Sequence, residues 1–499
     1  MTPRLSAGVL LLALAAGAAG QPKLLQGLSK DGPADPPERP KETAYALTLR
    51  AAGQPLPAMK HELLPTFRDQ TRNNAALLYH RALHLMSENR KPGKETGEAQ
   101  LKIEEHLNKP LKDIPVEELR TYLKPFPGTF RELEAAAKCR DCDWGLSDRI
   151  AAEQIALLLP EMQKCRELAF LLKVRCRLHL AEGNVDAALR DIQTGLAMGR
   201  HVGRSETLIS FLVGNAITAI MLNELHPVMQ APKSPNLYWA LTALPHPLMP
   251  LEAAMEGEMR SLDGMIALPR DLDEPMTAEQ ARLALDTMWA RMQKWSGELG
   301  AGNVPRMGVN ESRLFLAAYV TMTHPTAKKN LLAAGKTEAE LAAMPAAQVV
   351  LLDATVRYRN VRDQFMVWMF KPHDEAVKGM KMFEDTLKAM RQQPADYLNV
   401  MLGLLMPAVH KVYESQQRTD RRVASLRVVE AVRLHTAKTG KAPATLDDIT
   451  LVPVPADPTT GKPFAYTLSD AGFTVAVGPP PGQQSNPGNA WSYKITWAK

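Results

Sequence analysis

Apolar positions follow a helical period through most of the chain. From residue 57 to residue 412, runs rich in Ala, Leu, Met, Glu and Arg are broken only by Pro and by charged turns. Such runs of helix formers predict a body built almost wholly of helices. Within it, Thr207–Asn223 has no charged residue for seventeen positions. Because this stretch is too short to span a bilayer and contains Ser210, Asn215 and Thr218, we expect a buried helix.

The pattern changes near the C-terminus. Arg418–His435 predicts a helix whose core-facing stripe is Ala424, Val428, Ala431, Val432 and His435, with Arg427, Glu430, Arg433 and Lys438 on the opposite, solvent-facing side. Gly440 is expected to end it. Phe464–Leu468 and Phe473–Val477 predict an antiparallel hairpin, and Trp491–Trp497 a third strand. We therefore expect a small α+β module over residues 413–499, a helix plus a two- or three-stranded antiparallel sheet.

The loop chemistry of this module resembles a known family. Gly440-Lys-Ala-Pro443, followed by Asp457-Pro-Thr-Thr-Gly461-Lys-Pro463-Phe-Ala-Tyr466, resembles the globular part of type II secretion pseudopilins. The resemblance implies a structural loop, with calcium binding by Asp457 as the alternative. In that family a long hydrophobic helix precedes the globular part and drives fibre assembly. Here Pro407 is expected to interrupt or kink the preceding helix, so we do not expect polymerisation as a pilus.

A second resemblance lies in the helical body. Cys176 to Leu196, with a turn at Gly183 and the small residue Ala188, resembles a tetratricopeptide unit, and Ala75–Leu83 shares its spacing of small and large residues. The two segments are not in tandem, so the predicted fold is mainly α, an irregular, TPR-like body of helical hairpins. With the phrases Cys142–Gly145 and Pro235–Leu241, the chain resembles uncharacterised exported proteins of planctomycete-type bacteria, which implies an architecture and a compartment.

The N-terminus predicts export. A basic start, an apolar run from Leu5 to Ala16 and small residues up to Gly20 are typical of a signal peptide over residues 1–20. We expect its removal, leaving no integral membrane span, and a periplasmic or extracellular protein. Residues 21–56, rich in Pro, are predicted to be a flexible leader. The 60 basic and 54 acidic residues are intermixed and only 6% of residues are aromatic, which argues against a nucleic-acid partner.

Four cysteines are the sharpest chemical signal. In an exported protein, Cys139 or Cys142 could form a structural disulfide with Cys165 or Cys176; the alternatives are buried or free thiols, or a redox-active pair at Cys139 and Cys142. If Cys165 and Cys176 share one helix they are about 16 Å apart, so we predict that they are not bonded to each other and that a four-cysteine zinc site is absent.

Other candidate ligands are less specific. His80 and His84 are spaced to share a metal ion on one helix face, with Glu88 a turn further on, but Arg81 stands where a zinc peptidase has its Glu, so we expect a solvated or partner-facing surface. Met288 and Met292 could present thioethers to Cu(I), although this spacing is what any core stripe gives.

We identify no catalytic residues and no cofactor site, because a nucleophile elbow and phosphate-binding loops are absent from the sequence. The sequence therefore predicts an exported, non-enzymatic binding or scaffolding protein of the cell envelope with a protein or peptide partner. The alternative is a divergent envelope hydrolase with an unrecognised site. A buried carboxylate or His with a shifted pKa inside a cleft would favour that alternative.

Overall fold

The computed structural model describes residues 41–90, 94–153, 159–266, 271–299, 307–369, 371, 373–391 and 397–498. The predicted signal peptide, and residues 21–40 of the predicted leader, lie outside this part of the chain. The described residues form two compact units. The smaller unit contains those of 145–153 and 255–411, and the larger unit contains those of 41–144, 159–254 and 412–498.

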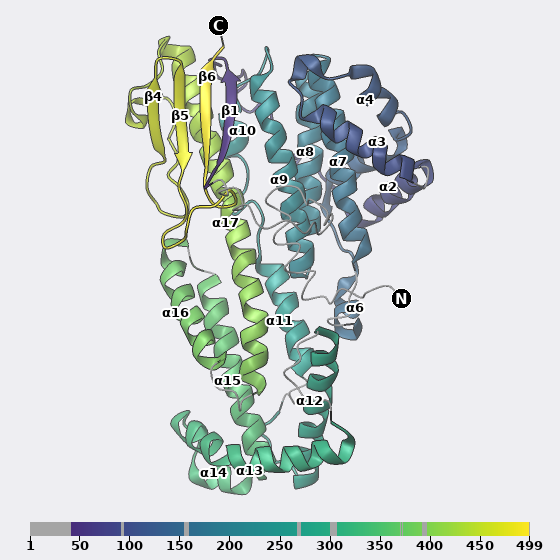
Figure 1. Ribbon diagram of the computed structural model, residues 1–499, viewed down its shortest axis with the longest axis vertical. Coiled ribbons are helices and arrows are strands. Elements are labelled where there is room, and N and C mark those ends of the chain that lie inside the picture. The colour runs from purple at the N-terminus through teal and green to yellow at the C-terminus, as the bar shows by residue number, and fades with distance from the viewer. Residues whose placement is uncertain are drawn as a thin grey trace, which may run out of the picture. The chain divides into compact units, whose positions relative to one another are not determined.

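The protein is mainly helical, as predicted, with a small C-terminal mixed sheet (Figure 1). The helices of the larger unit are α2 (Ala75–Asn89), α3 (Lys94–Leu107), η1 (Leu111–Asp113), α4 (Val116–Leu123), α5 (Pro127–Ala137), α7 (Pro160–Ala181), α8 (Val185–Gly203), α9 (Leu208–Gln230), α10 (Tyr238–Thr242) and η3 (Leu446–Asp448). Those of the smaller unit are α6 (Leu146–Glu153), most of α11 (Glu252–Ile266), α12 (Ala278–Leu299), α13 (Val309–Ala333), α14 (Glu338–Ala343), α15 (Ala346–Met369) and α16 (His373–Arg391). The long helix α17 (Tyr397–Thr439) belongs to the larger unit from Val412 onward.

The core of the larger unit is built on α7, α8 and α9, which pack against one another. α7 and α8 form the hairpin predicted around Gly183, whose φ of +77° lies in the left-handed region that favours glycine. The Asn184 side chain then caps α8 by accepting a hydrogen bond from the Ala187 N–H at 3.1 Å. A Cβ added to Gly199 of α8 would lie 3.0 Å from the carbonyl oxygen of Gly214 in α9. The two helix backbones therefore touch, which leaves room only for glycine.

α9 contains the uncharged segment Thr207–Asn223. Among the described helices it alone is long and apolar enough to cross a membrane, judged by length and composition. Sixteen of its residues are buried, as expected for a core helix. The polar residue Asn215 has partners on α17: its amide donates to the Ser415 carbonyl at 3.1 Å, and its side-chain oxygen accepts from Thr419 at 2.6 Å. The prediction of a buried helix is confirmed.

The sheet has four strands rather than two or three, in the order β1-β6-β5-β4 (Figure 1). The hairpin of β4 (Ala465–Ser469) and β5 (Gly472–Val477) and the third strand β6 (Trp491–Trp497) are antiparallel, as predicted. The fourth strand, β1 (Thr43–Leu49), pairs with β6 in parallel. These residues were predicted to be flexible leader, and that prediction is wrong for them. Leu47 and Leu49 are buried while Ala46 and Thr48 are exposed, the alternation of a half-buried strand.

A two-stranded parallel ribbon, β2 (Thr71–Asn74) with β3 (Cys139–Asp141), lies in the helical part of the larger unit. It too was not predicted. Its strands have four and three residues, too few for an alternating pattern to stand out in a sequence.

α17 differs from its prediction on the face assigned to solvent. The apolar stripe is correct for Ala424, Val428, Ala431 and Val432, which are buried, whereas His435 is half-buried. On the opposite side Glu430 and Arg433 are fully buried rather than exposed. They form an ion pair at 2.6 Å, and Arg433 also donates to the Arg50 carbonyl at 2.9 Å. The helix is covered on this side because the chain that follows β1 packs there.

α17 also continues through Pro407, where an interruption or a kink was expected. It runs unbroken from Tyr397 to Thr439 and ends at Gly440, as predicted, with φ of +76°. α9 and α13 likewise contain a proline each, Pro227 and Pro325. Proline removes one backbone hydrogen bond, and the bonds of neighbouring turns in a long helix can carry the helix past it. The predicted interruption is wrong.

Candidate binding site

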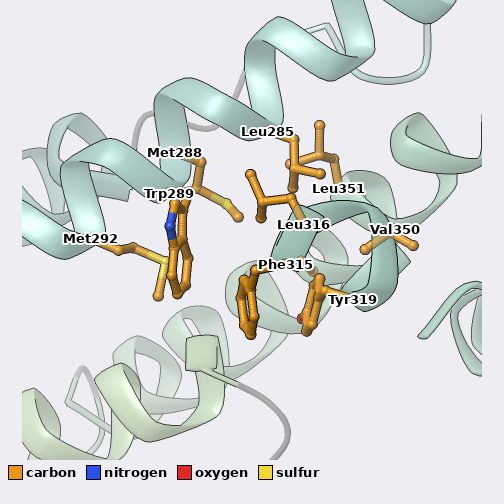
Figure 2. A pocket seen from close by; sticks show the side chains of 10 residues that line it. Leu285, Met288, Trp289, Met292, Phe315, Leu316, Tyr319, Val350 and Leu351 are labelled. Carbon is orange, nitrogen blue, oxygen red and sulfur yellow. The ribbon is translucent and has the colours of Figure 1, made fainter. Parts of the chain in front are cut away.

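An apolar pocket in the smaller unit is the best candidate for a functional site (Figure 2). Its walls are Leu285, Met288, Trp289 and Met292 of α12, Phe315, Leu316 and Tyr319 of α13, and Val350, Leu351 and Ala354 of α15. The cavity between them is small, about 20 Å³, and opens to solvent. All ten side chains are apolar or aromatic, so the pocket suits a hydrophobic group.

The pocket follows from the spacing of residues along the three helices. The four residues of α12 fall at i, i+3, i+4 and i+7, which is one helix face. They include Met288 and Met292, whose thioethers are thus pocket walls. Phe315 and Tyr319, four residues apart on α13, stand side by side in Figure 2 with ring centroids 6.4 Å apart. The Trp289 ring lies 4.8 Å from the Phe315 ring, and its indole N–H donates to the Ser312 hydroxyl at 3.3 Å.

Exposed apolar side chains continue from this pocket along α13. Leu314 and Met322 are each 75% exposed, and Ala318 between them is exposed as well. At 100° per residue these three lie on the side of α13 that adjoins Phe315. Pocket and row together form an apolar surface of a kind that marks interaction sites when it remains uncovered.

All four cysteines are free thiols, so the structure contains none of the disulfides considered above. Cys139, Cys165 and Cys176 are buried and Cys142 is partly exposed. Cys165 and Cys176 lie on one continuous helix, α7, as predicted. Burial raises the pKa of Cys165 to about 12 and also raises the pKa of Cys142 and of Cys176. A redox-active pair needs a lowered thiol pKa, so the chemistry here is that of packed, protonated thiols.

The backbone carbonyl group of Cys139 belongs to a buried chain of hydrogen bonds. It accepts a hydrogen bond from Nε2 of His201 at 3.0 Å, which fixes the proton on that nitrogen. Nδ1 of His201 therefore accepts from the Tyr79 hydroxyl at 2.8 Å. Burial lowers the pKa of His201 to about 4, so the ring is neutral. These hydrogen bonds join α2, α8 and β3.

His80 and His84 do not face a common ligand position. The His80 ring lies edge-on to Trp144, with centroids 5.3 Å apart, and His84 pairs with Glu88 at 3.3 Å on an exposed surface. Within the described residues, no three His, Cys, Asp or Glu side chains are placed to share a metal ion.

Asp457 faces a guanidinium. Arg421 of α17 donates from Nε to Oδ1 at 3.0 Å and from Nη2 to Oδ2 at 2.8 Å, and both residues are buried. The Thr459 N–H also donates to Oδ1 at 2.9 Å. Arg421 thus supplies the positive charge that calcium would bring, and the pair ties the loop to α17.

Two buried groups with shifted pKa values lie in the larger unit and outside the pocket. Burial raises the pKa of Asp420 to about 6, and its carboxylate accepts from the Leu248 N–H at 2.9 Å. Burial lowers the pKa of His226 to about 3, and its ring packs between Tyr45 and Tyr493 at 4.7 and 5.6 Å. Sequence reasoning missed both, since neither belongs to a motif. Their partners are backbone and aromatic groups of the fold itself.

Comparison with known proteins adds no relative to this description. No protein-family model, curated protein sequence or solved structure matches the chain.

Proposed function

We propose that this chain is an exported, non-enzymatic binding protein of the cell envelope that binds an apolar side chain of a protein or peptide partner at the α12–α13–α15 pocket, whose small cavity widens as its methionine walls adapt. Export rests on the N-terminal sequence pattern. In this proposal the α7–α8 hairpin is a tetratricopeptide-like unit, and α17 with the sheet is a relative of the pseudopilin globular part.

The observation that carries the proposal is the composition of the pocket walls. Aromatic rings and methionines are enriched where proteins bind other proteins, because rings offer large contact areas and thioethers adapt to the shape of the guest. Trp289, Phe315 and Tyr319 supply three rings from two helices, and Met288 and Met292 lie beside them.

The distribution of titratable groups supports binding over hydrolysis. Among the described histidines and carboxylates, Asp420, His201 and His226 have large shifts, and all three lie in the larger unit and bond or pack against the fold. A hydrolytic site would need such a group to line the cleft that holds the substrate. The walls of the pocket offer a guest mainly van der Waals contact.

The partner is an amphipathic peptide segment. Leu314, Ala318 and Met322 recur at every fourth residue, so a helical segment laid along α13 would meet them with apolar residues at matching spacing. One further side chain, aromatic or leucine, would enter the pocket as the anchor. Such anchors carry most of the binding free energy in helix-in-groove complexes.

The test is a titration of the full chain with synthetic amphipathic peptides that share one sequence and differ only at a single Phe, Leu or Ala. We expect the Phe and Leu peptides to bind and the Ala peptide to bind about tenfold more weakly or worse. Ala354→Leu fills the pocket and Met322→Glu places a charge at its rim. Each variant should weaken binding of the Phe peptide by a similar factor.

Leu283→Glu is the matched control. Leu283 is 59% exposed on α12 and lies on the side of that helix away from Leu285 and Met292. This variant should bind like the unmodified chain. Equal binding of the Phe and Ala peptides, or equal loss in Leu283→Glu, would refute the proposal.

A further inference from the structure

The two edges of the four-stranded sheet differ. At the β1 edge, the Thr48 N–H donates to the Gln230 side chain at 3.1 Å, so the fold satisfies this outward backbone group. At the other edge, β4 is Ala465-Tyr-Thr-Leu-Ser469, which contains neither a charged residue nor a proline, and four of these five residues are exposed. Natural sheets usually protect a free edge with charge, proline or a covering segment.

The alternation of hydrogen bonds between β5 and β6 determines which backbone groups of β4 face outward. The Trp497 N–H donates to the Ala471 carbonyl at 2.9 Å, so Phe473, Val475 and Val477 direct their backbone groups toward β6. Gly472, Thr474 and Ala476 therefore bond to β4, where their partners are Ser469, Thr467 and Ala465.

The N–H and C=O groups of Tyr466 and Leu468 must then point away from β5. In the described part of the chain these four groups have no hydrogen-bond partner. Leu468 is also 43% exposed on the face of the sheet that carries the buried Phe473 and Val475. The edge thus offers two donors, two acceptors and an uncovered apolar side chain.

We infer that this edge pairs with β4 of a second copy of the chain, antiparallel and about a two-fold axis at Thr467. The spacing is self-complementary: such an axis places Tyr466 opposite Leu468 of the second copy, and Leu468 opposite Tyr466. Each pair exchanges two N–H···O=C bonds, so all four outward groups are satisfied. The Tyr466 ring then covers Leu468 of the second copy, and the two Thr467 side chains meet at the axis, a favourable cross-strand pair.

Charge at the strand ends agrees with this register. Phe464 would face Asp470 of the second copy, which brings that carboxylate within reach of Lys462 two residues away. Lys462 and Asp470 are both exposed, and the axis generates the contact twice. A single five-residue strand pair makes a small interface, so the association is weak and depends on concentration.

The experiment is sedimentation equilibrium of the full chain at increasing concentration, to on the order of 0.1–1 mM, where weak dimers become populated. Thr467→Lys places two lysines directly opposite each other at the axis, and Thr467→Glu places two glutamates there. Residue 467 is exposed in the single chain, so both variants should fold; circular dichroism checks this. Each should weaken self-association at least tenfold, and their equimolar mixture should restore it.

Thr48→Lys is the matched control, an exposed threonine on the opposite edge strand of the same sheet, and it should associate like the unmodified chain. Three outcomes overturn the inference: an unmodified chain that stays monomeric at the highest concentration, single variants that associate as strongly as it does, or a mixture that associates no better than either variant. If the chain stays monomeric and an extended peptide binds to this edge, the partner is another protein segment and the inferred pairing of two copies is wrong.

Discussion

Two helices of similar length have opposite environments. α9 and α13 have 23 and 25 residues, each contains one proline, and each carries Leu, Met and Ala on several faces. In α9 sixteen residues are buried, whereas in α13 only Leu316, Ala327 and Leu331 are. Met221 of α9 is fully buried, and Met322 of α13 is 75% exposed. The more apolar helix, α9, is a core helix, whereas α13 exposes apolar side chains such as Met322.

The environment of each helix explains this difference. α9 packs against α7 and α8, and its polar residue Asn215 bonds to α17. α13 packs against α12 and α15, which leave the Leu314–Met322 row uncovered. Covering such a row would gain about 25 cal/mol per Å² of apolar area. In the larger unit that free energy stabilises the fold, and in the smaller unit it remains available for a partner.

The largest effect is expected at the buried ion pair of α17. Glu430→Ala leaves Arg433 buried without its counter-charge, and should lower the free energy of unfolding by about 3 to 5 kcal/mol. Urea unfolding followed by circular dichroism measures this. Glu338→Ala removes an exposed partner of Lys328 in the smaller unit and should cost less than about 1 kcal/mol. Similar losses in the two variants would show that burial is not what distinguishes the regions.

The next effect concerns the contact of α8 with α9. A Cβ at residue 214 would overlap the Gly199 carbonyl oxygen and the Gly203 backbone, so Gly214→Ala must push the helices apart. We expect a loss of about 3 kcal/mol in the same unfolding assay. Gly97→Ala, in α3 with open space around its Cβ position, should instead gain about 0.5 to 1 kcal/mol. A neutral Gly214→Ala would mean that the close packing is not required.

A smaller effect depends on pH. Burial raises the pKa of Asp420 to about 6, above its usual 3.8. Ionising this carboxyl group therefore costs more free energy in the folded state than in the unfolded state. Below pH 4 the group is protonated in both states and contributes nothing. As pH rises to 7, this group alone lowers stability by up to about 3 kcal/mol. Asp420→Asn should therefore be more stable than the unmodified chain at pH 7 and equal to it near pH 3.5. A constant difference across this range would contradict the assignment.

The smallest effect is expected on α13. Met322→Gln exchanges an exposed side chain and should change stability by no more than about 0.5 kcal/mol. Met221→Gln, the same exchange on α9, buries an amide without a hydrogen-bond partner and should lower the free energy of unfolding by about 2 kcal/mol or more. Equal costs would mean that Met322 is covered in solution, contrary to the structure.

Local sequence patterns predicted much of this fold. The α7–α8 hairpin, the buried α9, the β4–β5 hairpin, β6 and the end of α17 each depend on spacing or turn residues within a short stretch. β1 could not be predicted in the same way, because its register joins Thr43 to Trp491 and its own neighbourhood is rich in Pro. Arg433 and Glu430 were assigned to the side opposite the core-facing stripe from helical period alone, which does not show that the chain after β1 packs on that side.

Only part of the candidate site could be predicted from the sequence. The i, i+3, i+4, i+7 stripe of α12, from Leu285 to Met292, can be read from the chain and predicts a buried face. Whether the helices that cover such a stripe close over it completely depends on their crossing geometry and on side-chain volume, which spacing does not encode. Only the structure separates a filled core from a pocket.

The most direct test of the contrast between α9 and α13 is methionine oxidation by dilute peroxide, read by mass spectrometry of peptides from the full chain, with and without the anchored Phe peptide. We expect Met322 to oxidise early in the free chain and to be protected by the Phe peptide but not by its Ala counterpart, while Met221 stays reduced throughout. Oxidation of Met221 as fast as Met322, or no protection of Met322 by a bound Phe peptide, would contradict this expectation.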